Sequence, residues 1–424
     1  MKKYIFSLLA SLFLFASCSS SDDNDPKELY NEDSLTILSY MIASGNGLNQ
    51  FMSFNITTMY DGLASMDKPA TLIVYWDGDT RIGENKKTHL MLKYETDGKG
   101  NVNGKKALDT DAKESEILAE AQILKEYEPQ VCTDKDVMKQ VLKDMKSFAP
   151  TDKLGLIVGA HGSSWLNTIS TSRAVARAIG YDGNQSNSIL LPDMVEALES
   201  IGKKFEFILF DACFMGTAEA CYYFHSVSDY LIASVMEVPA YGFPYDWFMK
   251  YLYQDTEAGY RKVCECYIDY YKDIYNDENS SESAWGTIAL VDCKEVPALT
   301  ERIKEEIASH KSSLTNYDAD ELQEYGRYGG YGIAYDLEQF VKDLNGGESS
   351  AFKAQLDKTI LYKGCVEEAR SYRSGWSYDV DASNFCGLGI YIPGQSYSKW
   401  NTYFKTIDWF TASGWSTVDF GWNF

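Results

Sequence analysis

The stretch FILFDACFMG, residues 207–216, opens as an apolar strand and stops at an acid and a thiol. A second run of the same kind, LGLIVGAHG at residues 154–162, stops at a histidine and a glycine. Between them, a helical pattern has Pro192 in its first turn and closes at Gly202. Strand, helix and strand in this order predict a βαβ unit, whose two strands run parallel.

Further apolar, β-branched runs alternate with helical patterns, which is typical of a mostly parallel sheet covered by helices on both faces. The other core strands are expected to begin at Leu35, Thr71, Tyr230, Trp285 and Gly387. A hairpin over residues 90–104 is expected to project from this sheet. We therefore predict an α/β core over residues 34–296 and a smaller, tyrosine-rich C-terminal subdomain over residues 297–424, which includes the late strand.

The composition is that of a folded protein, with 45% hydrophobic and 24% charged side chains in 424 residues. The net charge of −23 repels phosphate backbones, so nucleic acid is not expected as a partner, whereas cationic peptides would be attracted. The nine cysteines are scattered and predict no disulfide framework. The CEC motif at residues 264–266 lacks a second matching pair, so no metal site is predicted.

Residues 1–17 have the basic start and short apolar core of a secretory signal. The sequence at its end, FASCSSSDDND, resembles a bacterial lipobox, although Phe15 stands where an aliphatic residue is usual. Cys18 would then carry the lipid, and residues 18–33 would form a tether. An ordinary signal peptide is the alternative. Because no other run approaches membrane-spanning length, we expect an exported protein of the bacterial cell envelope that contacts the membrane only through this anchor.

His161 and Cys213 leave the same edge of the predicted sheet, because each follows the carboxyl end of a parallel strand. Neighbouring strands lie about 4.8 Å apart, so a thiol and an imidazole can face one reaction centre. The imidazole can accept the proton of the thiol, and the helix expected after the thiol would favour the thiolate. The amides of Gly162 and Cys213 are candidates for an oxyanion site. Either side chain alone would be interpreted as structural, and only the pair predicts catalysis.

A strand that ends in His-Gly, followed by a strand that ends in Asp-Ala-Cys, resembles the clostripain (C11) family of cysteine peptidases, which belongs with caspases, gingipains and legumains. The resemblance runs from about Leu35 to the C-terminus and includes TLIVYWDG, YGFPYDWF, DLEQFV and GLGIYIP. It implies a caspase-like three-layer αβα sandwich, with Cys213 as the nucleophile and His161 as the general base or acid. The other histidines, His89, His225 and His310, are expected to be structural or surface residues.

The resemblance also implies that Asp211 forms an acidic wall of the S1 pocket and receives a substrate Arg or Lys. The alternative for Asp211 is a capping residue that shapes the turn. The stretch ASVMEVPAYGFPY, residues 233–245, would line the same pocket and would contribute Glu237 as a second acid. Val235 and Met236 are apolar, which a strict preference for basic residues does not predict.

Clostripain-like enzymes commonly mature by cutting themselves between the histidine and cysteine strands. Here that insertion contains TSRAVARAIGYDG, so Arg173 and Arg177 are the candidate cleavage sites, although both could instead lie on a solvated helix face. No metal is needed for the chemistry, and calcium, which is associated with clostripain, would be structural because the sequence has no EF-hand pattern. We expect a monomer that acts on proteins or peptides with basic residues.

The alternative from another class is a surface lipoprotein that binds glycan or protein without catalysis. The 14% aromatic content, with 31 Tyr and 9 Trp, supports it, because exposed rings stack on sugars. A third interpretation is a degenerate peptidase that serves as a binding module. It is disfavoured by the presence of His161, Gly162, Asp211 and Cys213.

Overall fold

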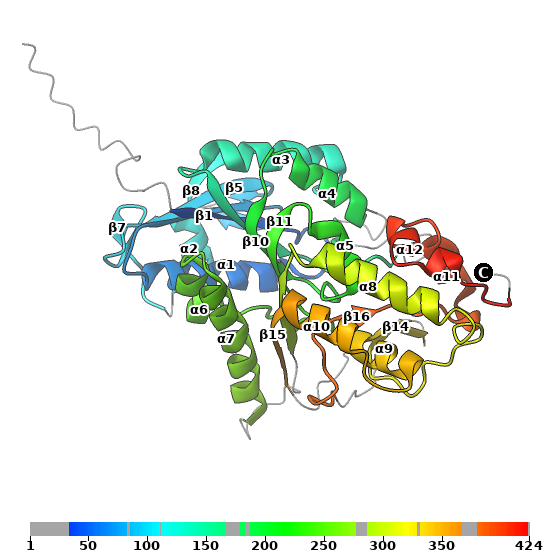
Figure 1. Ribbon diagram of the computed structural model, residues 1–424. Helices are drawn as coiled ribbons and strands as arrows, with labels where there is room; N and C mark the ends of the chain where they lie inside the picture. Colours follow the sequence, from blue (N-terminus) through cyan, green and yellow to red (C-terminus); the bar gives the residue numbers. More distant parts are fainter. Residues whose placement is uncertain are drawn as a thin grey trace, which may run out of the picture.

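Figure 1 shows the computed structural model, in which one large sheet is covered by helices on both faces. The structure describes residues 34–82, 85–110, 112–166, 179–182, 187–276, 286–328, 331–366 and 380–422. The signal segment, Cys18, Arg173 and Arg177 therefore lie outside the described residues. In the part of the chain that the structure describes, no helix combines the length and the apolar character that crossing a membrane requires.

Five parallel strands form the middle of the sheet, and they pair in the order β11-β10-β9-β1-β2. Their bounds are β1 (Leu35–Met41), β2 (Ala70–Trp76), β9 (Lys153–Gly159), β10 (Phe205–Asp211) and β11 (Ser228–Ala233). Nearly all their residues are buried, because alternate side chains face the helices on opposite sides of the sheet. Burial on both faces explains why these strands appear in the sequence as continuous apolar runs.

Antiparallel strands extend the sheet at both sides. One side adds β12 (Thr287–Asp292) and β15 (Ile360–Cys365), and the other adds β5 (Leu90–Thr96), β6 (Asn101–Val102), β7 (Lys105–Lys106) and β8 (Gln122–Glu126). The hairpin expected over residues 90–104 is present, since β5 pairs with β6, but it does not project from the sheet, because β5 pairs with β2 along its whole length. β5 therefore lies within the main sheet, between β2 and β8.

The helices form two layers, each with its own hydrophobic cluster. One layer consists of α3 (Lys135–Phe148), α4 (Leu191–Glu199), α5 (Ala218–Phe224) and α8 (Val296–Ser309). The opposite layer consists of α1 (Asn49–Ala64), α2 (Glu114–Glu120), α6 (Tyr245–Leu252) and α7 (Glu257–Asn276). Along β9 and β10, Leu156 and Ile208 belong to the first cluster, whereas Ile157 and Leu209 belong to the second. This arrangement is the three-layer αβα sandwich that the sequence predicts.

The ends of α3 show how local chemistry fixes a helix. The carboxylate of Asp134 caps α3 by accepting hydrogen bonds from the second and third helical amides, and the neighbouring Thr133 hydroxyl donates to the carbonyl of Asn187 at 2.8 Å instead. The helix stops at Phe148, two residues before Pro150, as expected from the restriction that proline imposes.

The C-terminal part of the chain shares the core of the sandwich. It contains β13 (Glu324–Tyr328), β14 (Tyr331–Asp336), α9 (Leu337–Asn345), α10 (Ser350–Thr359), β16 (Gly389–Ile390), α11 (Ser398–Phe404) and α12 (Asp408–Ala412). The late strand expected from Gly387 was assigned to the wrong sheet. It contains β16, which joins a separate three-stranded sheet with β13 and β14, whereas β15 is the strand that enters the main sheet. The ring of Trp165, soon after β9, packs on Tyr391 and Phe404 at centroid distances of 4.7 and 4.8 Å.

The remaining short elements lie at the periphery of these layers. They are β3 (Thr80–Ile82), β4 (Asn85–Lys87) and the two 3-10 turns Gln395–Tyr397 and Trp415–Thr417. β3 and β4 pair with each other as a two-stranded ribbon outside the main sheet. None of these four elements contributes a residue to the site described next.

Candidate active site

The carboxyl ends of β9 and β10 lie side by side and place the predicted residues together. The last paired residues of the two strands are Gly159 and Asp211. His161 and Cys213 each follow this pair by two residues, so both leave the sheet at the same level. Gly162 lies against the backbone of Cys213: a β-carbon at Gly162 would be 2.3 Å from the Cys213 carbonyl oxygen and 3.0 Å from its amide nitrogen. His161, Gly162 and Cys213 therefore leave the sheet at one edge.

The imidazole of His161 is held by two neighbours. Its Nε2 lies 3.1 Å from the main-chain carbonyl oxygen of Asn46, and this oxygen can only accept, so Nε2 carries the proton. In the neutral ring the lone pair is then on Nδ1. The ring also stacks on Tyr181, with centroids 4.6 Å apart and planes inclined by 2°. Both the tautomer and the plane of the ring are thus set by contacts.

The thiol of Cys213 is half-buried and lies close to the main chain of Val238. The Val238 amide donates to Sγ at 3.4 Å, which favours the thiolate, and the thiol donates to the Val238 carbonyl at 3.8 Å, which favours the protonated form. Phe214, the next residue, has φ of 61°, so the chain leaves β10 through a left-handed turn. For a bulky residue this backbone conformation is costly and is typical of turns that aim a functional side chain.

The helix after Cys213 begins later than expected. α5 starts at Ala218, and its cap is Thr217, whose hydroxyl accepts from the Ala220 amide at 3.3 Å. The prediction that the thiol sits at a helix N-terminus was therefore wrong, because four residues intervene, beginning with the left-handed Phe214. The Val238 amide is the donor that the structure provides at the sulfur instead.

Other cysteines have less favourable surroundings for chemistry. Burial raises the pKa of the Cys221 thiol to about 12 and raises the pKa of Cys293 well above its usual value. A thiol that stays protonated is a weak nucleophile. Cys266 and Cys365 are half-buried like Cys213, but Cys266 lies in α7, and Cys365 ends β15, which is separated from β10 by β11 and β12.

Asp211 is buried, with 3% of its surface exposed. Its carboxyl accepts a hydrogen bond from the Asn55 amide at 3.0 Å and from the Tyr245 hydroxyl at 2.9 Å. Burial raises the pKa of Asp211 to about 7, and the bonds from Tyr245 and the Phe243 amide oppose this shift. The carboxyl therefore ties β10 to α1 and α6, and a substrate cation would have to displace these partners. Glu237 is also buried, with 7% exposed.

The three other histidines lie elsewhere, and each has a ring nitrogen at a main-chain carbonyl. His89 Nε2 is 2.8 Å from the Gln130 oxygen, His225 Nδ1 is 2.6 Å from the Tyr222 oxygen, and His310 Nδ1 is 2.9 Å from the Glu306 oxygen. These histidines stand before β5, after α5 and after α8.

Sequence reasoning missed a buried group of two carboxyls and a thiol near the histidine. The ligand atoms of Asp77, Cys132 and Asp182 all lie within 4.8 Å of one another, a set that could hold a metal ion such as zinc. The Cys132 thiol donates to Asp77 at 2.8 Å, and its amide donates to Asp182 at 2.6 Å. Burial raises the pKa values of the Cys132 thiol and the Asp77 carboxyl. The signal in the sequence was Asp77, which directly follows the apolar strand TLIVYW, much as Asp211 stands at the end of the apolar run of β10.

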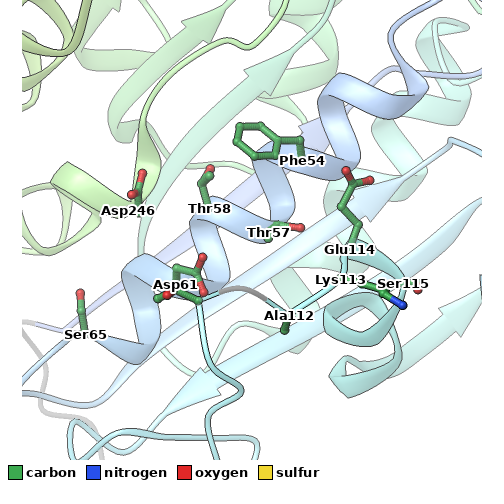
Figure 2. A pocket seen from close by; sticks show the side chains of 11 residues that line it. Phe54, Thr57, Thr58, Asp61, Ser65, Ala112, Lys113, Glu114, Ser115 and Asp246 are labelled. Carbon is green, nitrogen blue, oxygen red and sulfur yellow. The ribbon is translucent and has the colours of Figure 1, made fainter. Parts of the chain in front are cut away.

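A cavity of about 920 Å³ lies between α1 and the starts of α2 and α6, and Asp61, Asp246 and Phe54 are among the residues that line it. Figure 2 shows these side chains. Burial raises the pKa of Asp61 to about 6, with a further contribution from Asp246. Neither His161 nor Cys213 lines this cavity. Phe54 packs edge-on against Tyr241 at 5.9 Å, so the cavity adjoins the segment expected to bind substrate.

A thiol and an imidazole at the carboxyl edge of a mostly parallel sheet define a cysteine hydrolase of the caspase-like type. The sequence model of the clostripain family matches residues 39–422, and the chain therefore belongs to the clostripain (C11) family. It is a cysteine peptidase, and the alternative of a non-catalytic lipoprotein is set aside.

Solved structures agree with this assignment. An inactive zymogen C11 protease from Parabacteroides distasonis is 23% identical with a TM-score of 0.70, covering 89% of this chain and 97% of that one. A secreted C11 cysteine protease from Bacteroides thetaiotaomicron, in complex with an irreversible peptide inhibitor, is 27% identical with a TM-score of 0.70, covering 91% and 100%. No curated protein matches the sequence.

Proposed function

We propose that the protein is an exported endopeptidase that cleaves after Arg or Lys by means of a Cys213–His161 dyad. The observation that carries the proposal is the shared edge of β9 and β10, where His161 and Cys213 follow the last paired residues by the same number of positions. Peptide substrates are supported by the related enzyme from Bacteroides thetaiotaomicron, which binds a peptide inhibitor irreversibly.

The proposed reaction uses the two side chains in turn. Nδ1 of His161 accepts the thiol proton, and the Cys213 thiolate forms a bond to the substrate carbonyl carbon. The negative charge on the carbonyl oxygen is stabilised by the amides of Gly162 and Cys213. Within the described residues, the Gly162 amide donates no hydrogen bond, so it is available for this role. The imidazolium returns its proton to the leaving amine, and a water activated by His161 then hydrolyses the thioester.

The preference for a basic residue is supported by charge. The chain carries a net charge of −23, Asp211 stands two residues before Cys213, and Glu237 precedes Val238, whose amide contacts the Cys213 sulfur. The adjoining cavity adds Asp61 and Asp246. A guanidinium or ammonium is the natural partner of such carboxylates once they are ionised.

Self-processing and export complete the proposal. Arg173 and Arg177 lie between the histidine and cysteine strands, which is where a cut would separate the two catalytic residues into different pieces. One structural neighbour is an inactive zymogen, which suits a protein that matures by self-cleavage. Another is secreted, which suits export through the signal segment before Cys18. The mature protein would then be a monomer anchored to the cell envelope by its lipid.

The test compares purified residues 19–424 with Cys213→Ala and Arg173→Ala/Arg177→Ala variants. Release from Arg-, Lys-, Asp- and Asn-terminated fluorogenic peptides is measured, and the fragments are followed on a denaturing gel. We expect cleavage after Arg or Lys that disappears in Cys213→Ala, and an uncut chain in the arginine double variant. Cys266→Ala, which removes another half-buried thiol, is the matched control and should retain full activity.

Each part of the proposal has its own contradicting result. Cleavage after Asp or Asn would keep the dyad and overturn the basic preference. A folded sample in which no peptide is cleaved in a Cys213-dependent manner would overturn the endopeptidase proposal. Self-cleavage that persists without Arg173 and Arg177 would move the processing site elsewhere.

A further inference from the structure

The short segment 179–182 lies next to His161, although it is well separated from this histidine in the sequence. The Gly180 amide donates to the His161 carbonyl oxygen at 2.7 Å, and Ile179 forms a β-bridge to Gly162. On its other side, Ile179 exchanges two main-chain hydrogen bonds of 3.1 Å with Ile189, just before α4. Isolated bridges of Ile179 therefore hold the segment beside the end of β9, and it carries Tyr181 to the face of the imidazole.

Asn46 joins the histidine to its stacking partner. Its main-chain oxygen accepts from His161 Nε2, while its side-chain amide donates to the Tyr181 carbonyl at 3.0 Å and to the Ile42 carbonyl at 2.9 Å. Its side-chain oxygen accepts from the Leu48 amide at 2.9 Å. Asn46 thus holds both Nε2 of His161 and the main chain of Tyr181, which stacks on the imidazole.

The next residue, Asp182, anchors the segment in the interior. Its carboxylate accepts from the Cys132 amide, and the Cys132 thiol donates to Asp77. The other oxygen of Asp77 accepts from the amides of Ala43 and Ser44 at 3.0 and 2.7 Å. This chain of buried hydrogen bonds connects the segment to the ends of β1 and β2, and buried polar networks of this kind rigidify what they hold.

We propose that Tyr181 is a positioning residue that fixes the plane of the His161 ring and so keeps Nε2 at the Asn46 carbonyl, and that Asp182 is the anchor that holds Tyr181 there. The inference rests on the proposed Cys213–His161 chemistry. An imidazole that rotates about its side-chain bond would present another atom to Cys213, and the stacked ring of Tyr181 opposes that rotation. All of these contacts are made to residues outside 167–178, so a cut in that stretch would leave the support in place.

The experiment uses purified residues 19–424 and the variants Tyr181→Leu, Tyr181→Phe and Asp182→Ala. We expect Tyr181→Leu to lower kcat about tenfold to hundredfold with KM changed less than about threefold, because a misaligned base affects the reaction and not the binding of substrate. Tyr181→Phe keeps the ring and should restore kcat to within about twofold of the original chain. Asp182→Ala should reproduce the kcat loss.

A second measurement separates this inference from the proposed function. The rate at which iodoacetamide alkylates Cys213, located by mass spectrometry, depends on thiolate formation and needs no knowledge of the substrate. Slower alkylation in Tyr181→Leu, restored in Tyr181→Phe, would support the inference even if no peptide is cleaved, and such inactivity would count against the proposed function alone.

Two results would overturn the inference. One is a Tyr181→Leu variant with unchanged kcat and unchanged alkylation. The other is a rise in KM at constant kcat, which would make Tyr181 a substrate contact. Thermal unfolding of each variant identifies a chain that has failed to fold, and in that case the Tyr181→Phe and Tyr181→Leu pair is compared at a temperature where both are folded.

Discussion

At the edge where β9 ends, Gly162 packs against the peptide unit that carries the nucleophile. In Gly162→Ala the added carbon would lie 2.3 Å from the Cys213 carbonyl oxygen, so one of the two chain segments must shift. We expect kcat/KM to fall at least about tenfold, because a displacement of this size disturbs the alignment of the reacting groups. The free energy of unfolding should fall by about 1–3 kcal/mol, as in other overpacked positions.

Steady-state kinetics and urea denaturation of Gly162→Ala check this prediction. The control is Ser163→Ala, one residue on, which removes only the hydroxyl and its hydrogen bond to the Leu166 carbonyl. A Gly162→Ala variant with normal kinetics would mean that the turn adjusts without moving Cys213.

The carboxyl of Asp211 makes the stability of the fold depend on pH. Burial raises its pKa from 3.8 to about 7. Between these two values the unfolded chain has lost the proton that the folded protein keeps, so the free energy of unfolding falls as pH rises through this window. Asp211→Asn removes the cost of ionising a buried carboxyl. The free energy of unfolding of this variant, minus that of the parent, should therefore rise by roughly 2 kcal/mol between pH 5 and pH 8.

This prediction is measured by chemical denaturation in a Cys213→Ala background, which prevents self-digestion. Asp136→Asn, at a side chain with 87% exposure, is the control and should show no such trend. If Asp211→Asn follows the same pH curve as its parent, the carboxyl is ionised in the folded protein and its burial is compensated by another group.

The placement of His161 and Cys213 at one edge of the sheet could be predicted from the sequence, whereas the contacts that support them could not. His161 and Cys213 follow apolar strands directly, and the topology of a βαβ unit places such positions together. Asn46 acts through its main-chain oxygen and Tyr181 through the face of its ring. Such contacts leave no pattern in the sequence, because they depend on how loops far apart in the chain meet. The burial of Asp211 was missed for the same reason.

Among the elements, α1 and α6 are in close contact through Gly62. A β-carbon at Gly62 would lie 2.7 Å from Met249 Cγ and 2.9 Å from the Tyr245 carbonyl oxygen. Alanine favours a helix interior by about 1 kcal/mol over glycine, but here the clash should dominate. We expect Gly62→Ala to lower the free energy of unfolding by about 1–3 kcal/mol, since the main chain of α6 cannot rotate away as a side chain can.

Denaturation of Gly62→Ala beside Gly347→Ala tests the packing, because a β-carbon at Gly347 would meet nothing within 4 Å. Equal stability of the two variants would show that α6 moves away from α1 at little cost. A loss of activity in Gly62→Ala would show in addition that the shift of α6 also displaces Asp211, whose carboxyl is held by Asn55 of α1 and Tyr245 of α6.

The central strands were predictable because they are buried on both faces, and such strands are uninterrupted apolar runs. The edges of the sheet were not. β15 has the sequence ILYKGC and is only partly buried, so it lacks the apolar run that identifies a core strand. β16 is an apolar run of which only two residues pair, because the surrounding chain packs as irregular structure against the C-terminal helices.

At the scale of the whole molecule, the sheet joins the pieces on either side of the proposed processing stretch. β1, β2 and β9 precede residues 167–178, and β10, β11, β12 and β15 follow them, with β9 and β10 paired over five positions. The first hydrophobic cluster also spans both pieces. Cleavage after Arg173 or Arg177 should therefore leave a single particle that retains the activity.

Size-exclusion chromatography of the processed protein, followed by a denaturing gel of the peak, tests this prediction. We expect one peak at the position of the uncut chain and two bands on the gel. The arginine double variant supplies the uncut reference. Two separate peaks would mean that the covalent link through residues 167–178 is needed to hold the sheet together.

The chain has four histidines, and the way each one is bonded makes the active-site ring observable in solution. His89 and His161 direct Nε2 at a carbonyl oxygen, whereas His225 and His310 direct Nδ1. In a nitrogen-15 NMR spectrum the four rings should separate into two tautomer classes of two. Of the first class, only the resonance of His161 should change when Cys213 is alkylated, so the protonation of the proposed general base can be followed without altering a residue.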